Sequence, residues 1–184
     1  VARNKDEGFP FLGQAYDDKP AMRDTVPAGE RASRAELLAL ANGYFETIER
    51  NDGTLRTKFW PSCNRVENGV QTTNNATFPL PIARLGCEEQ FAMGWYRYDD
   101  RLRARRFPLV DEERGIVLAY GFIDHCGIVG EYTLTDGTPA RSPVRRPHSY
   151  YLAEAFKIRR GAIEQVEAVF HTVPYHMPSP WDGR

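Results

Sequence analysis

Two long stretches of alternating residues near the end of the chain constrain its fold most strongly. Residues 149–158 and 163–173 flank Arg160-Gly161, a pair that suits a two-residue hairpin turn. A second pair of strands is predicted at residues 105–110 and 116–123. Hairpins with one apolar face need another layer to cover that face. The sequence therefore predicts an antiparallel sheet that packs against other elements.

The elements that can cover this sheet lie earlier in the chain. Ser33 and Glu36 fit a capping box, and apolar residues follow at helical spacing as far as Ile48. A second helix is predicted over residues 84–98, and residues 54–82 are predicted to be irregular, with Asn and Thr side chains bonded mainly within turns. Helices first and an antiparallel sheet last predict an α+β fold.

The length favours one domain, because domains usually have about 100–200 residues and this chain has 184. Residues 1–32 contain three prolines without sustained periodicity, which predicts an extended N-terminal arm. The remaining residues, 33–184, are predicted to form a single domain whose C-terminal tail is residues 174–184.

Composition and charge exclude several classes of function. The formal net charge of −1 argues against a nucleic-acid partner, and no apolar run reaches the roughly 20 residues that cross a bilayer. Cys63, Cys87 and Cys126 show no close pairing and no metal-type spacing, which predicts unpaired cysteines in a reducing compartment and a cytoplasmic location. No metal or cofactor is expected, because the chain has no HExxH motif and no glycine-rich phosphate loop.

The closing hairpin supplies the first candidate catalytic residues. With a two-residue turn at Arg160-Gly161, Glu154 faces Glu167 and Tyr150 faces His171 across the strands. Two carboxyl groups that meet in an apolar setting have perturbed pKa values, which suit general acid–base catalysis. The alternative hypothesis places this face in solvent or at a subunit interface, with both acids solvated.

Two further candidates lie elsewhere in the chain. His125 follows Asp124 at the end of a predicted strand, where it either relays protons or is an ordinary loop histidine. Arg65 shares a strand-like face with Glu67, so it either anchors an anion or forms an ion pair with Glu67.

Several segments together resemble the nuclear-transport-factor-2-like (SnoaL-like) superfamily, over roughly residues 33–181. They are the helix at 37–48 and the hairpin turn at 161–164. Residues 65–69 and 174–181 resemble one bacterial branch of it, and the chain is similar to sphingomonad enzymes that remove formaldehyde from lignin-derived aromatic dimers without a cofactor. This resemblance implies a cone in which a curved antiparallel sheet wraps around N-terminal helices.

The resemblance also implies a reaction and a partner. The substrate would be an aromatic small molecule of the 1,2-diarylpropane-1,3-diol type, which loses water and formaldehyde through a quinone methide to give a stilbene. Glu154 or Glu167 would supply the acid, His125 or His171 the base, and Arg65 or a tyrosine would stabilise a phenolate. Further residues could bind the substrate's rings or pack in the core: Tyr44, Trp60, Trp95, Tyr96 and Tyr150. Asp124, beside His125, is a further candidate substrate-binding residue.

The alternatives are a dehydratase, isomerase or cyclase that acts on another aromatic or polyketide-like molecule, and a ligand-binding domain without catalysis. Proteins of this superfamily commonly assemble, so a homo-oligomer, either a dimer or a trimer, is expected.

Overall fold

A curved sheet of six strands organises the structure, a computed structural model that describes residues 19–182. The strand order is β2-β1-β8-β7-β4-β3, and β5 and β6 form a separate two-stranded ladder. The strands are β1 (Phe59–Glu67), β2 (Val70–Gln71), β3 (Arg101–Asp111), β4 (Ile116–His125), β5 (Glu131–Thr133), β6 (Pro139–Arg141), β7 (His148–Arg159) and β8 (Ala162–Val173). Neighbouring strands are antiparallel except β1 and β8, which pair in parallel.

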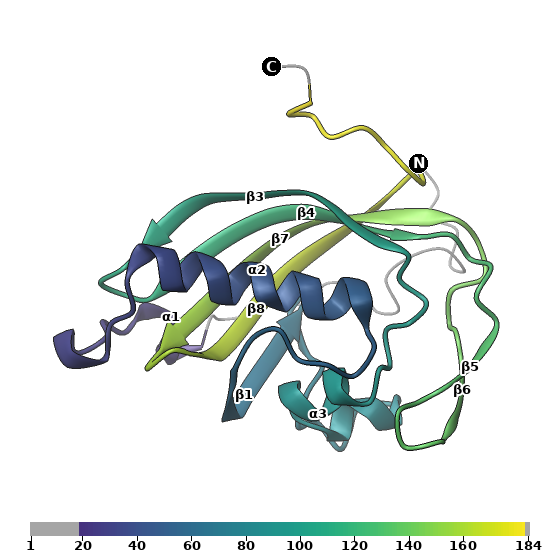
Figure 1. The fold of residues 1–184 in the computed structure, drawn as a ribbon, viewed down its shortest axis with the longest axis horizontal. Coiled ribbons are helices and arrows are strands. Elements are labelled where there is room, and N and C mark those ends of the chain that lie inside the picture. Colours follow the sequence, from purple (N-terminus) through teal and green to yellow (C-terminus); the bar gives the residue numbers. More distant parts are fainter. Residues whose placement is uncertain (1–18, 183–184) are drawn as a thin grey trace.

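One long helix fills the concave side of this sheet. In Figure 1, α2 runs beneath the arch formed by β3, β4 and β7. The helical elements are α1 (Pro20–Arg23), η1 (Ala28–Glu30), α2 (Arg34–Arg50), η2 (Pro81–Arg84) and α3 (Cys87–Ala92). The predicted fold class, an α+β fold with a curved sheet and N-terminal helices, is confirmed.

The start and the buried face of α2 follow from its sequence. The Ser33 hydroxyl accepts a bond from the Glu36 backbone N–H, and the Glu36 carboxylate accepts one from the Ser33 N–H, so the predicted capping box is confirmed. Tyr44 and Phe45 project into the sheet, where their ring centroids lie 4.9 and 5.6 Å from that of Phe156. These edge-to-face contacts fix α2 against β7.

The segment before the sheet differs from its prediction in two ways. The predicted helix at 84–98 is shorter in the structure, where α3 covers only Cys87–Ala92. It ends there because Gly94, two residues later, takes a left-handed φ of 67°. Within residues 54–82, which were expected to be irregular, β1 is a nine-residue strand. Its sequence does not alternate strictly, since it is an inner strand paired with β2 on one side and β8 on the other.

A β-bulge in the closing hairpin changes its predicted register. The turn at Arg160-Gly161 and the pair Arg159–Ala162 are as predicted, with left-handed φ angles of 50° and 69° in the turn. Beyond Ile158–Ile163 the register shifts, and Lys157 faces Gln165 instead of Glu164. The extra residue moves every later side chain of β8 to the opposite face.

Lys157, on the outer face of the hairpin, binds the segment that precedes α2. Its ammonium group donates to the backbone carbonyls of Asp24 (2.5 Å) and Arg114 (2.6 Å), and the side chain is buried. Residues 19–32 thus lie against the sheet at its turn end, where Glu30 also pairs with Arg160. The remainder of the predicted arm, residues 1–18, lies outside the described residues.

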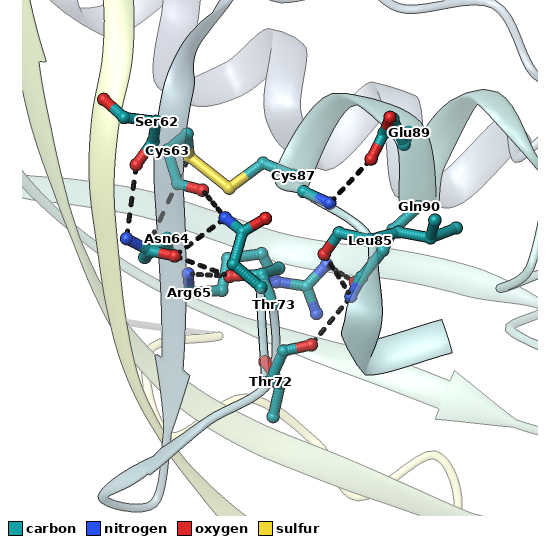
Figure 2. The surroundings of a disulfide bond; sticks show 12 residues. Ser62, Cys63, Asn64, Arg65, Thr72, Thr73, Leu85, Cys87, Glu89 and Gln90 are labelled. Carbon is teal, nitrogen blue, oxygen red and sulfur yellow. Dashed lines mark hydrogen bonds between the residues drawn. A yellow bond between two sulfur atoms is a disulfide. The ribbon is translucent and has the colours of Figure 1, made fainter. Parts of the chain in front are cut away.

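A disulfide bond joins Cys63 of β1 to Cys87 of α3, so the predicted unpaired state of these two cysteines is wrong (Figure 2). Their Cα atoms lie 5.7 Å apart although 24 residues separate them in the chain. Spacing alone did not reveal this contact, because β1 was not predicted. Disulfides persist in oxidising compartments, so the argument for a cytoplasmic location loses its basis. Cys126 is the free cysteine.

The disulfide predicts a dependence of stability on redox state. Because the bond closes a loop of 24 residues, its loss should lower the free energy of unfolding by about 3 kcal/mol, or the melting temperature by roughly 6–12 °C. Thermal unfolding of the Cys63→Ser/Cys87→Ser variant, and of wild type in reductant, measures this loss. Cys126→Ser is the matched control and should melt like wild type. An unchanged melting temperature after reduction verified by mass spectrometry would contradict the prediction.

Candidate active site

A cavity of about 420 Å³ lies on the concave side of the sheet, between the second half of α2 and the segments that precede β3 and β7. Most of its wall is aromatic or aliphatic, with a few ionisable groups among the rings. A cavity of this kind suits a flat apolar ligand that a few polar groups orient. Its aromatic lining consists of Tyr44, Phe78, Trp95, Tyr96, Tyr98, Tyr150 and Phe170.

The structure brings together seven of the eleven residues that the sequence nominated. Of the candidate catalytic residues, Glu154, His125 and Arg65 line the cavity. Four candidate substrate-binding residues line it as well: Tyr44, Trp95, Tyr96 and Tyr150.

The other two candidate catalytic residues lie outside the cavity because of the bulge. Glu154 faces Ala168, while Glu167 faces Ala155 on the outer side of the sheet. There the Glu167 carboxylate accepts a bond from the backbone N–H of Lys19 (3.0 Å). His171 is exposed on the same outer side and faces Tyr151 instead of Tyr150. The predicted pairing of Glu154 with Glu167 is therefore wrong.

Two candidate binding residues, Trp60 and Asp124, do not line the cavity and make structural contacts elsewhere. Trp60 donates its indole N–H to the Arg159 carbonyl (2.9 Å), and the Arg159 guanidinium lies 4.6 Å from its ring centroid, at the hairpin end of the sheet. Asp124 points away from His125, because adjacent strand residues face opposite sides. It accepts hydrogen bonds from Arg103 (2.7 Å) and Ser149 (2.5 Å).

Asp124 joins the sheet to the C-terminal tail. The Ser149 hydroxyl that donates to Asp124 also accepts the backbone N–H of His176 (3.1 Å), and Arg103 donates to the Met177 carbonyl (2.8 Å). Burial alone would raise the pKa of Asp124, but the bonds from Arg103 and Ser149 outweigh it and keep the pKa low. Asp124 is thus an ionised structural group.

Glu154 is the most perturbed acid of the cavity. The residue is 2% exposed, and burial raises the pKa of its carboxyl to about 8. The neighbouring charge of Glu67 raises the pKa further, whereas Arg65 and a hydrogen bond with Tyr44 lower it only in part. Glu154 is therefore a protonated acid at neutral pH, surrounded by rings.

A buried ion pair forms the wall beside Glu154. The Arg65 guanidinium binds the Glu67 carboxylate, donates to Gln90 Oε1 (3.3 Å) and lies over the Phe91 and Tyr96 rings. Arg65 therefore forms the ion pair with Glu67 that the sequence left as one alternative, and it also lines the cavity.

Gln90 connects this pair to the loop before α3. Its amide NH₂ donates to the carbonyls of Thr72 (2.7 Å) and Ile82 (3.0 Å), and its Oε1 accepts the Tyr96 hydroxyl (2.8 Å). Figure 2 shows Gln90 one turn beyond the disulfide, with Arg65 two residues beyond Cys63 on β1. The disulfide therefore joins the two elements that hold the Arg65–Gln90 contact. Within the segment 54–82, the expected turn bonding occurs at Asn75, whose Nδ2 donates to the Gln71 carbonyl (2.9 Å) and whose Oδ1 accepts the Thr77 hydroxyl (2.7 Å). Asn74 instead donates to the Cys63 carbonyl on β1 (3.2 Å).

A second ionisable centre lies at the other end of the cavity. His125 Nε2 is 2.8 Å from Asp99 Oδ1, and both side chains are 4% exposed. Burial raises the pKa of Asp99, whereas His125 lowers it. The ring of His148, which faces His125 across the strands, stacks on it with centroids 4.7 Å apart. His125 Nδ1 has no hydrogen-bond partner within residues 19–182. The Asp99–His125 centre can therefore accept a proton.

The two centres lie apart along one strand. Glu154 follows His148 by six residues on β7, which is about 20 Å along an extended backbone. The arched sheet turns both side chains toward the same cavity, and Tyr150 lies between them, with its ring centroid 4.9 Å from that of His125. A ligand that reaches both centres must be elongated.

The sequence did not indicate some groups of the candidate site. Asp99 and Tyr98 lie between α3 and β3, with Asp99 26 residues before His125, and carry no local pattern that marks them. Glu67 was considered only as a partner of Arg65. His148 was not singled out because it was placed outside the predicted strand.

Two further structural features concern metals and membranes. In the part of the chain that the structure describes, no three His, Cys, Asp or Glu side chains are grouped so as to hold a metal ion. No helix between residues 19 and 182 has the length and apolar character needed to cross a membrane.

Comparison with known proteins places most of this chain in one family. The model described as "Domain of unknown function (DUF8021)" matches residues 30–170, which include both ionisable centres. No curated protein matches the chain.

Solved structures give distant likenesses. AusH from Aspergillus nidulans is 14% identical, with a TM-score of 0.49 over 76% of this chain and 86% of that chain. AclR from Streptomyces galilaeus is 16% identical, with a TM-score of 0.47 over 76% and 91%. LinA is 12% identical, with a TM-score of 0.41 over 80% and 94%. Because identities and TM-scores are this low, the candidate site is interpreted from its own residues.

The raised pKa of Glu154 predicts an unusual dependence of stability on pH. In the unfolded chain this carboxyl ionises near its ordinary pKa of 4.5, but in the folded chain it keeps its proton up to about pH 8. The folded state thus binds more protons in this window, so its stability falls as pH rises. The cost at pH 8 is on the order of 5 kcal/mol. Glu154→Gln cannot ionise and should escape this loss.

Urea unfolding at pH 5 and pH 8 measures the effect. The stability of Glu154→Gln relative to wild type should rise by several kcal/mol between the two pH values. Glu167→Gln, the same substitution on the outer face, is the matched control and should show no such rise. Parallel stability curves for wild type and Glu154→Gln would contradict a raised pKa at Glu154.

Proposed function

The chain belongs to the family defined by the domain of unknown function DUF8021, and we propose that it is an enzyme that performs acid–base chemistry on an aromatic substrate with two rings. One observation carries the proposal: the Glu154 carboxyl is buried in an aromatic cavity, and this burial raises its pKa to about 8. Keeping it there destabilises the fold at neutral pH, and a ligand-binding role gives no reason for that cost. An acid with a pKa near the working pH is what proton transfer requires.

The spacing of the two centres supports a substrate with two rings. The cavity volume of about 420 Å³ is in the range of small-molecule sites. One ring would lie near Asp99 and His125, and the other near Tyr44 and Glu154. The neutral hydroxyls of the cavity tyrosines, whose pKa values burial raises, can donate hydrogen bonds to oxygen atoms of the substrate.

The specific reaction that we propose is the removal of water and formaldehyde from a 1,2-diarylpropane-1,3-diol. The substrate carries a phenolic hydroxyl para to the benzylic carbon, on the ring nearest His125. In the first step His125, beside Asp99, takes the proton of this hydroxyl while Glu154 gives its proton to the benzylic hydroxyl. The benzylic C–O bond breaks, water leaves, and the ring electrons form a neutral quinone methide. This step leaves Glu154 as a carboxylate and His125 as an imidazolium.

In the second step the same two groups return to their starting states. The Glu154 carboxylate takes the proton of the primary hydroxyl, and the O–H electrons form the C=O bond of formaldehyde. The C–C bond breaks, and its electrons restore the aromatic ring as a phenolate and complete the stilbene. His125 then returns its proton to the phenolate. The sum is one diol to one stilbene, one water and one formaldehyde, with no change in oxidation state overall.

Turnover of such a diol tests the proposal. Chelator-treated protein should release formaldehyde and produce stilbene absorbance in equal amounts. Glu154→Gln should lower kcat by 10²-fold or more, the typical size of a general-acid effect, whereas Glu167→Gln should turn over like wild type. Absorbance change without formaldehyde would instead indicate a dehydratase. No turnover, or full activity in Glu154→Gln, would overturn the proposal.

The pH profile gives an independent check on the role of Glu154. Because Glu154 must carry its proton to begin the reaction, kcat/KM should fall above about pH 8, where the free enzyme loses that proton. In Asp99→Asn, kcat/KM should be lower than in wild type at every pH, but it should still fall above about pH 8. An alkaline limb that is absent in wild type would contradict the role of Glu154 as the acid.

A further inference from the structure

Arginines surround the opening of the cavity. Arg141 ends β6, and Arg145 and Arg146 lie in the loop that leads to β7; all three are exposed and also line the cavity. Residues that are both exposed and in contact with the cavity mark its mouth. Figure 1 shows β5 and β6 at the same end of the molecule as α3, and the Tyr132 hydroxyl fixes this hairpin by donating to the Trp95 carbonyl (2.6 Å).

Two of these guanidinium groups have no partner among the residues that the structure describes. Between residues 19 and 182, the side chains of Arg141 and Arg145 make no ion pair or hydrogen bond. Glu131 is the ladder partner of Arg141, yet the two side chains form no ion pair. The arginines of β3 behave differently.

On β3, Arg101 and Arg103 both bind Asp124, and Arg105 binds Glu49. The mouth of the cavity is therefore a place where cationic groups remain available to a ligand.

The interior of the cavity, in contrast, offers no free cationic group among the residues that the structure describes. Its carboxyl groups are Glu67, Asp99 and Glu154, and the one buried guanidinium among its lining residues, Arg65, already binds Glu67. Glu154 is protonated and Glu67 is neutralised by Arg65, so no free cation among the described residues inside the cavity would compensate an anionic substituent for its lost hydration, whereas the arginines at the mouth would attract it. Guanidinium groups match the two oxygens of a carboxylate better than any other side chain does.

We infer that Arg141 and Arg145 bind a carboxylate on the aromatic substrate and so set both its charge and its direction in the cavity. The inference rests on the proposed function for the ring-binding role of the cavity. His148 Nδ1 donates to the Arg146 carbonyl (3.0 Å) and the His148 ring stacks on His125, so the mouth adjoins the Asp99–His125 centre. The carboxylate therefore belongs to the ring nearest His125, and the rest of the substrate extends toward Glu154.

Equilibrium binding tests the inference without turnover. The probes are trans-stilbene-4-carboxylate and the neutral trans-stilbene-4-carboxamide, followed by quenching of tryptophan fluorescence at low salt. Wild type should bind the carboxylate at least tenfold more tightly, and added salt should reduce this preference. Arg141→Ala/Arg145→Ala should bind both probes alike. Both substitutions are at exposed positions, so circular dichroism and melting temperature should match wild type.

A matched control removes the same charge elsewhere. Arg34 and Arg114 lie at the N-terminal end of α2 and in the β3–β4 turn, at the opposite end of β4 from His125. Arg34→Ala/Arg114→Ala should keep the preference for the carboxylate. Equal affinities in wild type, a preference that survives in Arg141→Ala/Arg145→Ala, or no binding of either probe would overturn the inference. Turnover of a neutral diol is measured in a separate assay. If wild type prefers the carboxylate probe but does not turn over the diol, the proposed reaction is rejected and the carboxylate-binding inference stands.

Discussion

The β-bulge in the closing hairpin determines which side chains meet inside the sheet. Lys157 is held on the outer face by two backbone carbonyls, and the extra residue beside it turns Val166, Ala168 and Phe170 toward α2. The small Ala168 then lies across from Glu154, so the carboxyl has no second acid opposite it in the ladder. Aromatic rings surround the Glu154 carboxyl in place of water. This loss of hydration, and not a second carboxylate in the ladder, is the main reason that it keeps its proton.

The cavity keeps its opposing charges in separate places. Arg65 and Glu67 neutralise each other under Gln90, which leaves Glu154 as an acid, while Asp99 lies beside His125 at the other end. Such separation lets one site hold a proton donor and a proton acceptor without their exchanging protons directly. Elongated substrates gain from it, because their distant oxygen atoms can be protonated and deprotonated at the same time.

Local patterns in the sequence were enough for the main elements but not for the contacts between them. The capping box at Ser33, the turn at Arg160-Gly161 and the alternation in the last two strands predicted α2 and the hairpin correctly. The bulge carries no pattern, so Glu167 and His171 were placed on the wrong face. Long-range contacts, such as Cys63 with Cys87 and Asp99 with His125, join segments whose local sequences do not reveal one another. The predicted homo-oligomer stays a prediction, as do the catalytic roles.

The parallel pairing of β1 with β8 affects the order in which the chain folds. Residues 59–67 cannot complete their ladder until residues 162–173 exist, so about half the chain must be synthesised in between. Contacts of such large sequence separation are slow to form. Cys87, in contrast, follows Cys63 closely, and their bond can hold β1 against α3 while β8 is still absent. Nascent chains would then protect the wall around Arg65 first and close the cavity last, when the C-terminal strand arrives.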